Sequence, residues 1–417
     1  MTAPETQALF RVFARIGIYS FGGPAAQIAL MHRELVEETR WLSEKDFLGA
    51  LSFCMLLPGP EAMQLATYAG WRLRGVPGGL LAGLLFVVPG AIVMFALATI
   101  YAVYGNVPLV EAAFLGVQAT VVAIVLEALF KVSKRALKQT DHWIIAALAF
   151  VAIFALHLPF PFIIAVAALW GFFTAKGEND SGRAPVSPST TTKTIAVWLT
   201  LWAAPIVLLY ALDATLLTDI ALFFSKLAVV TFGGAYAVLA YMTQTVVSDF
   251  GWLSTDQMMD GLGLAETTPG PLILVTQFVG FQTAYQQYGL AQAYLAGLIT
   301  LWVTFIPCFL WIFAGAPYVG RLTANRRLSG ALSAVTACVV GVILNLSLWF
   351  AAHVVFKSIG TATFGPASIL VPDLTSLDPV AAVISVIGAY LLLGQKIGLG
   401  RTLGIGALLG LVAGLAF

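Results

Sequence analysis

The sequence predicts an all-α polytopic membrane protein made of two repeats with inverted topology. Of its 417 residues, 60% are hydrophobic and only 10% are charged, whereas soluble domains carry about 25% charged residues. A block of the first half returns in the second half, and the basic residues of the connecting turns change sides between the halves. These observations favour a membrane protein that arose by tandem duplication.

The repeat is clearest where residues 19–60 align with residues 230–271 without a gap. Of these 42 positions 14 are identical, where this composition would give about 3 or 4 by chance. The match resumes downstream at a displacement of 218, where Pro89 aligns with Pro307. Repeats of this length are typical of two-halved transporters rather than solenoids. The motifs shared at a displacement of 211 are Ser20-Phe21-Gly22-Gly23 with Thr231-Phe232-Gly233-Gly234, Trp41-Leu42-Ser43 with Trp252-Leu253-Ser254, and Pro58-Gly59-Pro60 with Pro269-Gly270-Pro271.

The apolar segments predict about thirteen transmembrane helices, because a span needs about 20 residues. We expect a first repeat over 1–174, a polar linker with one further span over 175–219, and an inverted second repeat over 220–417. The linker span at 195–212 reverses the second half. The expected spans lie near 9–31, 47–70, 76–104, 109–130, 142–157 and 160–174 in the first half, and near 220–247, 261–281, 292–318, 329–350, 379–393 and 402–417 in the second.

The distribution of Lys and Arg predicts the topology. Basic turns face the cytoplasm, which places the turns at 72–74 and 131–138 inside and the turns at 105–108 and 157–161 outside. In the second half the pattern is reversed. The turn at 282–291, which corresponds to the basic turn at 72–74, lacks Lys and Arg, whereas the turn that corresponds to 105–108 carries Arg321, Arg326 and Arg327. The N-terminus shows no cleavable signal pattern. We therefore expect a multi-pass protein of a bacterial-type inner membrane, with the N-terminus cytoplasmic and the C-terminus outside.

The two Pro-Gly-Pro motifs predict broken helices inside the bilayer. Two prolines around a glycine remove two amide donors and clash with the preceding turn. Irregular backbone is tolerated at membrane depth only inside protein or beside a watery cavity, so matching breaks predict a shared cavity. The N-termini of the half-helices that follow are suited to binding an anion. The candidate binding residues are Ser20, Phe21, Gly22, Gly23, Pro58, Gly59, Pro60, Thr231, Gly233, Gly234, Pro269, Gly270 and Pro271; close packing of the Gly-Gly pairs and simple proline kinks are the alternatives.

Four charged residues accompany these motifs. Arg15 and Lys226 are repeat equivalents, each five residues before its Ser/Thr-Phe-Gly-Gly motif. We expect them to attract an anion unless they snorkel to the interface. Glu61 follows one break and Glu266 precedes the other, although they are not repeat equivalents. Ionisable groups inside spans are costly, so both are candidates for proton coupling, with helix capping as the alternative for Glu61.

The remaining polar residues give no sign of catalysis. The three cysteines and four histidines lack metal-ligand spacing, so we expect buried apolar roles for Cys54, Cys308 and Cys338 and neither a metal nor a cofactor. We find no nucleotide-binding loop and no hydrolase motif in the sequence, and expect no nucleic-acid partner. Eight charged residues between Arg33 and Asp46 are predicted to form a solvated or interfacial segment, and Glu127 a surface pair with Lys131.

At these motifs the chain resembles the chromate ion transporter family in its long, two-domain form. The motifs that carry the resemblance are Phe21-Gly22-Gly23-Pro24, Trp41-Leu42-Ser43, Leu57-Pro58-Gly59-Pro60-Glu61-Ala62-Met63-Gln64, Gly116-Val117-Gln118, Phe232-Gly233-Gly234 and Thr267-Thr268-Pro269-Gly270-Pro271. The second half has Ala235 where the first has Pro24. The resemblance implies a carrier that exports chromate, with sulfate, another tetrahedral dianion, as a possible substrate.

Export of a dianion would need no nucleotide. Moving two charges through 100 mV yields about 4.6 kcal/mol, so we expect alternating access driven by the membrane potential, by protons, or by both. The alternative is a carrier of sulfate or another oxyanion on the same scaffold, working either outward or inward. A membrane enzyme or a channel is the remote alternative. A homo-oligomer is compatible with the sequence.

Overall fold

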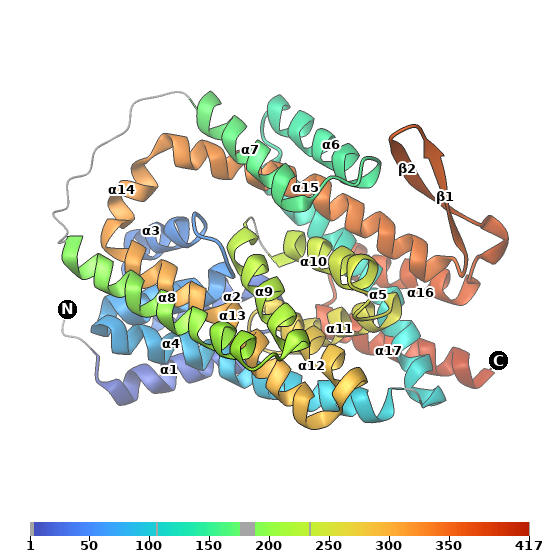
Figure 1. Cartoon of the computed structure of the whole chain (residues 1–417), viewed down its shortest axis with the longest axis horizontal. Coiled ribbons are helices and arrows are strands. Elements are labelled where there is room, and N and C mark those ends of the chain that lie inside the picture. The colour runs from blue at the N-terminus through green and yellow to red at the C-terminus, as the bar shows by residue number, and fades with distance from the viewer. Residues whose placement is uncertain (1–3, 106, 176–187, 233–234, 417) are drawn as a thin grey trace. The chain divides into compact units, whose positions relative to one another are not determined.

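The structure, a computed structural model, describes residues 4–105, 107–175, 188–232 and 235–416. These residues are almost entirely helical (Figure 1). The chain forms two compact units, and each unit combines segments from both halves of the sequence. Unit 1 comprises Met1–Thr99, Lys176–Ala235 and Thr268–Ser329, and unit 2 comprises Ile100–Ala175, Tyr236–Thr267 and Gly330–Phe417.

Unit 1 contains both Pro-Gly-Pro motifs. Its long helices α4 and α13 pack through glycine against aromatic rings, as described below, and α12 packs along α13. Its elements are α1 (Thr6–Tyr19), α2 (Gly23–His32), the π-helix η1 (Arg33–Glu38), α3 (Glu44–Cys54), α4 (Glu61–Tyr104, whose last residues belong to unit 2), α8 (Pro188–Ala211), α9 (Thr215–Val230), η3 (Leu272–Leu274), α12 (Val275–Tyr288), α13 (Leu290–Gly315), η4 (Ala316–Tyr318) and α14 (Val319–Ala324).

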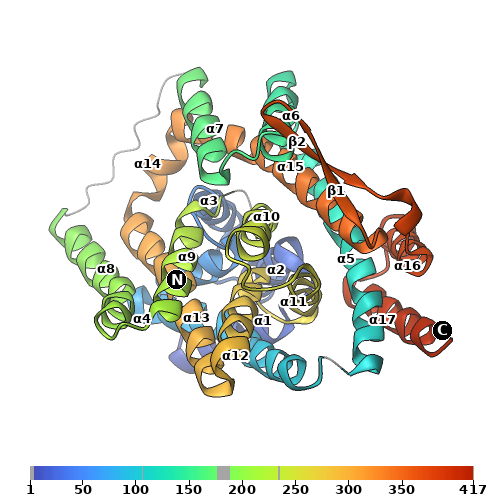
Figure 2. The ribbon, with the colours of Figure 1, turned by 45° about the vertical axis from the view of Figure 1, so that its right-hand side comes forward.

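Unit 2 is organised around α5, which lies along α17 and also contacts α16 and α11 (Figure 2). A Cβ at Gly116 of α5 would lie 1.9 Å from the carbonyl oxygen of Gly406 of α17, so only glycine allows this approach. Its elements are α5 (Pro108–Ala136), α6 (Thr140–Phe154), α7 (Phe160–Thr174), α10 (Ala235–Gln244), the π-helix η2 (Thr245–Asp249), α11 (Thr255–Thr267), α15 (Arg326–Val355), β1 (Ile359–Phe364), β2 (Ala367–Pro372), η5 (Leu374–Ser376), α16 (Pro379–Ala389), the π-helix η6 (Tyr390–Gly394) and α17 (Leu399–Ala416).

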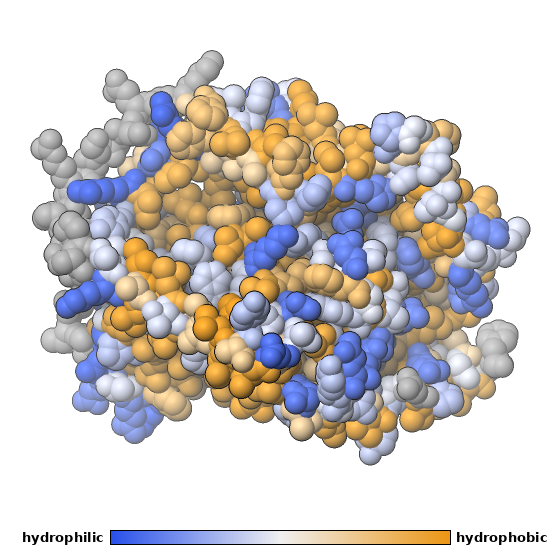
Figure 3. Space-filling view, viewed as in Figure 1, coloured by the Kyte–Doolittle hydropathy of each residue, from blue (hydrophilic) through white to orange (hydrophobic). Residues whose placement is uncertain are grey.

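Five of the described helices have the length and composition of membrane spans. Apolar side chains cover much of the face in Figure 3, as expected where the solvent is lipid. These features identify a multi-pass membrane protein; the count of thirteen spans stays a prediction. Among the described residues, five helices are long and apolar enough to cross a bilayer, namely Glu61–Tyr104, Pro108–Ala136, Thr191–Ala211, Leu290–Ala324 and Arg326–Val355, and four shorter apolar helices are Thr140–Phe154, Phe160–Thr174, Pro379–Gly394 and Leu399–Leu415.

Both Pro-Gly-Pro motifs interrupt the helices, as predicted. Helix α3 ends at Cys54 and α4 begins at Glu61, while α11 ends at Thr267 and η3 begins only at Leu272. The central glycines, Gly59 and Gly270, have φ values of 116° and 88°, a region that side chains with a Cβ rarely adopt. Proline on either side and a left-handed glycine between them together prevent helix continuation.

The expected first span is also two helices rather than one. Helix α1 ends at Tyr19 and α2 begins at Gly23, because Gly22 and Gly23 have φ values of 85° and 79°. The equivalent Gly233 and Gly234 lie outside the described residues. The spans expected at 47–70 and 76–104 are separated as predicted, because the backbone of Arg74 and Gly75 is not helical and divides α4 into two helices. A Cβ at Gly83 would lie 2.5 Å from Thr67 Oγ1, so these two helices pack against each other. The first of them begins only at Glu61, after the Pro-Gly-Pro break, and not at 47.

One feature departs from an all-α chain. Strands β1 and β2 form an antiparallel hairpin with Phe364 opposite Ala367, and Gly365 in the turn has a φ value of 59°. The segment is rich in Ile, Thr and Val, which favour strands, and the glycine allows the tight turn. No element is expected from the sequence between residues 350 and 379, so the hairpin was not predicted.

Two π-helices occupy equivalent positions in the two repeats. Element η1 covers Arg33–Glu38, and η2 covers Thr245–Asp249. With the displacement of 211, residues 33–38 correspond to 244–249. Turns of this kind are rare and often occur at functional sites, so their recurrence at one register adds a structural similarity to the sequence repeat.

Candidate functional site

Within unit 1, each Pro-Gly-Pro segment is hydrogen-bonded to a segment from the opposite half of the chain. The Gly59 N–H donates to the Thr231 carbonyl at 2.8 Å, and the Gly270 N–H donates to the Ser20 carbonyl at 2.9 Å. Gly59 and Gly270 are repeat equivalents, as are Ser20 and Thr231. Each broken helix is therefore completed by the segment that precedes the Phe-Gly-Gly motif of the other half.

A second pair of contacts has the same reciprocity. A Cβ at Gly79 of α4 would lie 2.6 Å from the Phe313 ring of α13, and a Cβ at Gly297 of α13 would lie 2.6 Å from the Phe95 ring of α4. Gly79 and Gly297 are equivalent at the displacement of 218, as are Phe95 and Phe313. The exchange of partners extends from the breaks into the long helices.

The positions facing the two central glycines are also equivalent. A Cβ at Gly59 would lie 2.9 Å from Cys308 Sγ, and one at Gly270 would lie 3.8 Å from Gly90 Cα. Gly90 and Cys308 each follow the aligned prolines Pro89 and Pro307. The candidate glycines are thus enclosed by protein, and all six proline and glycine positions except half-buried Pro58 are buried.

The two expected hydroxyl groups are engaged within their own helices. Ser20 Oγ donates to the Ile16 carbonyl and Thr231 Oγ1 donates to the Leu227 carbonyl, each at 2.6 Å. Both side chains are buried. A hydroxyl has a single proton to donate, so in this arrangement neither group can donate to an anion. Phe21 is exposed next to Gly22.

Two glutamines support the breaks, and neither was identified from the sequence as a site residue, although Gln64 closes the Leu57–Gln64 motif. Gln27 Nε2 donates to the Gly270 carbonyl and Gln64 Nε2 donates to the Pro58 carbonyl, each at 2.6 Å. Gln64 Oε1 is buried without a hydrogen-bond partner among the described residues. A polar amide in an apolar helix beside a break is the sequence signal that points to Gln27.

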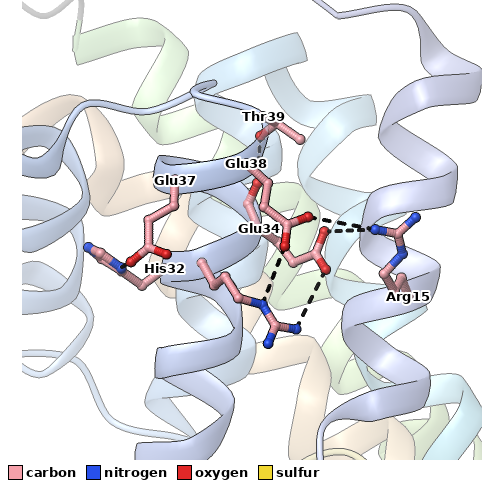
Figure 4. A network of polar contacts seen from close by, with 7 residues as sticks. Arg15, His32, Glu34, Glu37, Glu38 and Thr39 are labelled. Atoms are coloured by element: carbon pink, nitrogen blue, oxygen red, sulfur yellow. Dashed lines mark hydrogen bonds and ion pairs between the residues drawn. The ribbon is translucent and has the colours of Figure 1, made fainter.

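Arg15 is paired with carboxylates rather than isolated (Figure 4). Its Nη1 lies 3.4 Å from Glu34 Oε2 and 3.9 Å from Glu38 Oε2, and the Arg15 side chain remains 53% exposed. Arg33 contacts the same two carboxylates at 4.0 and 3.5 Å. Glu34 is only 2% exposed, so the prediction of a solvated segment was wrong for this residue, because two guanidinium groups compensate its charge.

The same segment contains a histidine with two carboxylate neighbours. His32 Nε2 lies 2.7 Å from Glu44 and Nδ1 lies 3.1 Å from Glu37 (Figure 4 shows the contact with Glu37). The hydrogen bond that the His32 ring donates to Glu44 and the negative charge of both glutamates raise the pKa of His32, against a smaller opposing effect of burial. Protonation of His32 therefore strengthens the contacts between α2 and the start of α3.

The other charged candidates lie on separate elements. Lys226 is exposed on α9. Glu61 is the first residue of α4 and half-buried, where the helix dipole favours negative charge. Glu266 of α11 is 7% exposed and accepts a hydrogen bond from the Tyr236 hydroxyl at 3.0 Å. Glu61 belongs to unit 1 and Glu266 to unit 2.

Asp260 is a buried carboxylate that sequence reasoning missed. It is 5% exposed, and Tyr101 Oη and Gln118 Nε2 donate to its two oxygens, each at 2.8 Å. Gln118 closes the Gly116-Val117-Gln118 motif, which gave the only sequence signal. Both buried carboxylates of α11, Asp260 and Glu266, thus accept from a tyrosine hydroxyl.

No metal-binding group of three or more His, Cys, Asp or Glu side chains occurs among the described residues. The three cysteines are buried and unpaired by disulfides, as predicted. Glu127 and Lys131 form the predicted pair at 2.8 Å.

Comparison with known families identifies the protein class. The model of the chromate transporter family matches residues 7–172 and 218–415. The chain belongs to the chromate transporter family. The two matched regions leave out the segment that contains the polar linker and the expected inverting span. No solved structure matches this chain.

Curated members of the chromate transporter family are similar over most of the chain. The chain is 33% identical to the chromate transport protein of Pseudomonas aeruginosa, over 80% of this chain and 78% of that protein. It is 31% identical to a probable chromate transport protein of Synechococcus elongatus, over 82% and 83%. It is 30% identical to the chromate transport protein of Cupriavidus metallidurans, over 82% of each chain. Family members are transport proteins, and the apolar helices agree with a multi-pass protein of the bacterial plasma membrane.

Proposed function

We propose that this protein is a secondary transporter that exports chromate across the bacterial plasma membrane by alternating access. The reciprocal hydrogen bonds of Gly59 with Thr231 and of Gly270 with Ser20 carry the proposal. They bring two broken helices of an apolar protein into one packed unit, as in carriers whose substrate sites lie between discontinuous helices. The names of the family relatives supply chromate as the substrate.

The repeats are proposed to be inverted about an axis in the membrane plane. Reciprocal contacts are the pattern that a two-fold relation produces, since each contact of one half recurs with the roles exchanged. The reversed distribution of basic turns supports inversion over a parallel arrangement. With thirteen spans, this places the N-terminus in the cytoplasm and the C-terminus outside.

The oxyanion is proposed to bind at the first turns of the half-helices that follow the breaks. The N–H groups of Gly59 and Gly270 already donate to carbonyls, so these glycines shape the site instead of contacting the anion. The first turns of α2, α4 and the η3–α12 segment supply the positive helix ends. Phe21, Gly22 and Gly23 and the prolines of both motifs form its surroundings, while Gly233 and Gly234 lie outside the described residues.

Arg15 and Lys226 are proposed to increase the local concentration of the anion. Glu34 and Glu38 neutralise much of the Arg15 charge in the structure. A dianion that approaches Arg15 competes with these carboxylates, so Arg15 contributes to binding in proportion to its release from Glu34. Lys226, exposed on α9, supplies the equivalent charge in the second half.

Glu61 and Glu266 are proposed to couple proton movement to transport. A carboxylate in the first turn of α4 repels a dianion at the same helix end, so binding favours protonation of Glu61. This linkage moves the proton with the anion. Glu266, buried beside the Tyr236 hydroxyl, is the second proton acceptor. An interior-negative potential favours export when fewer than two protons leave with the dianion, because net negative charge then moves outward.

Flux in proteoliposomes tests the function. We expect chromate efflux that rises when the compartment containing chromate is made negative by about 100 mV, and reduced flux in Glu61→Gln and Glu266→Gln with normal insertion. The exposed Glu5→Gln is the matched control. Sulfate is tested as competitor and as labelled substrate. Absence of chromate flux, or sulfate flux that chromate does not inhibit, would refute the proposal.

A further inference from the structure

A groove outside the proposed transport site lies in unit 2 between α6 and α7. Figures 1 and 2 show these two helices side by side, near α15. The groove has a volume of about 390 Å³, within the range of about 300–1,000 Å³ for small-molecule sites. Cys338 of α15 contributes to the wall, and Asp141 is the only charged residue of the lining.

The walls of the groove suit a hydrocarbon chain. Leu148 and Phe162 line it and are largely exposed at its edges, while Ala149 and Ala167 keep the space between the helices open. Water in such a space would lack the two to four polar partners that it needs. The occupant must therefore be apolar over most of its length.

One end of the groove is next to a basic turn. The chain passes from exposed Lys134 and Lys138 directly into α6, whose second residue is Asp141 of the lining. His142 Nδ1 contacts the Ala136 carbonyl at 2.7 Å, which fixes the start of α6 against this turn. The backbone segment that carries these two lysines therefore lies next to the end of the groove that Asp141 lines.

An aromatic residue marks the same end. Trp170 lines the groove near the end of α7. Ser333 of α15 contacts His142 at 3.3 Å, and a Cβ at Gly171 would lie 2.3 Å from the Gly330 carbonyl of the same helix. The end of α7 and the start of α6 therefore meet the same turn of α15. Tryptophan in spans is typical of the headgroup level.

We propose that this groove binds an anionic phospholipid, with an acyl chain between α6 and α7 and the phosphate held by Lys134 and Lys138. The apolar walls suit the acyl chain, the neighbouring cations suit the phosphate, and Trp170 is at the end where a headgroup would lie. A second copy of this chain would fill the apolar walls but would not account for the cations. Lys131 is engaged with Glu127, so it is not assigned to the phosphate.

Native mass spectrometry of the full-length protein tests this site. The probes are phosphatidylglycerol and phosphatidylcholine with identical acyl chains. We expect at least five-fold greater retention of phosphatidylglycerol, and we expect the double variant Lys134→Gln/Lys138→Gln to abolish that preference while both lipids still bind. The matched control is Lys396→Gln/Arg401→Gln, which removes two exposed cations elsewhere in unit 2.

A second test of the lipid site uses substitutions that fill the groove. Ala152→Phe and Val166→Trp place a ring in the space, and we expect either variant to reduce retention of both lipids several-fold while the protein elutes as the wild type does. Equal retention of the two lipids by the wild type would overturn the proposal. So would retention unchanged in every groove variant that folds, or a wild-type dimer that dissociates when the groove is filled, which would identify a second copy as the occupant.

Discussion

The N–H of Gly59 donates to the carbonyl of Thr231 at 2.8 Å, across 172 positions of the chain. Its counterpart joins Gly270 to Ser20. The amide N–H at each break is thereby paired with a carbonyl of the opposite half. In an apolar region an unpaired amide would cost about several kcal/mol of folding free energy. Neither half of the chain can complete this arrangement alone.

Substitution of Gly59 by alanine should destabilise the protein and stop transport. A Cβ there would lie 2.9 Å from both Cys308 Sγ and Gln64 Nε2, at a φ of 116°. Such backbone strain costs about 1–3 kcal/mol. The thermal midpoint in detergent and the chromate flux report the effect. Gly49→Ala, where no atom lies within 4 Å of the new Cβ, is the control, and an unchanged midpoint for Gly59→Ala would contradict the structure.

Variants of Arg15 and Glu34 should change substrate affinity in opposite directions. Because Glu34 occupies the guanidinium at 3.4 Å, Glu34→Gln releases Arg15 and should lower the KM for chromate by about 3- to 10-fold, whereas Arg15→Gln should raise it by a similar factor, which corresponds to about 1 kcal/mol. Initial rates over a range of chromate concentrations measure both. If the double variant kept the low KM of Glu34→Gln, Arg15 would have no role in binding.

Stability should depend on the protonation of His32. Its pKa is raised, chiefly by the hydrogen bond to Glu44, so the folded state binds this proton more tightly than the unfolded state. The contribution is therefore complete below the unfolded pKa of about 6.5 and is lost as the pH rises through the higher folded pKa. The thermal midpoint of His32→Gln, subtracted from that of the wild type, should shrink with rising pH. A constant difference would exclude this linkage.

Removing the hydroxyl that holds Asp260 should destabilise unit 2. Tyr101→Phe deletes the donor at 2.8 Å and leaves one oxygen of a buried carboxylate without its partner, a loss of about 1–3 kcal/mol. Tyr104→Phe, three residues along the same helix and exposed, should have little effect. Denaturation midpoints of the two variants make the comparison; equal midpoints would mean that the Tyr101 hydrogen bond contributes nothing.

The membrane class, both helix breaks and the family could be predicted because each rests on residues adjacent in sequence. Proline and glycine act on the backbone within a turn, so Pro58-Gly59-Pro60 suffices to predict an interruption. The pairings could not be predicted in the same way. Tyr101 and Asp260 are 159 positions apart, and nothing in either local segment identifies the other.

Charge was the least predictable property. The run from Arg33 to Asp46 has the composition of a solvated segment, yet Glu34 is buried because Arg15 reaches it from another helix. The same contact changes the expected role of Arg15. Composition gives the number of charges in a segment, whereas the three-dimensional packing decides which charges are neutralised.

The π-helical segment Arg33–Glu38 also sets an angular register. An ordinary α-helix advances by about 100° per residue, and a π-turn accommodates one additional residue. Deleting a single residue there would restore regular geometry but rotate α2 by about that angle relative to the Trp41-Leu42-Ser43 turn. Gln27 would then point away from the Gly270 carbonyl that it now reaches at 2.6 Å. The number of residues between Gln27 and the Trp41-Leu42-Ser43 turn is therefore fixed by the direction in which Gln27 must point. The length of this segment cannot change by one residue without loss of that contact.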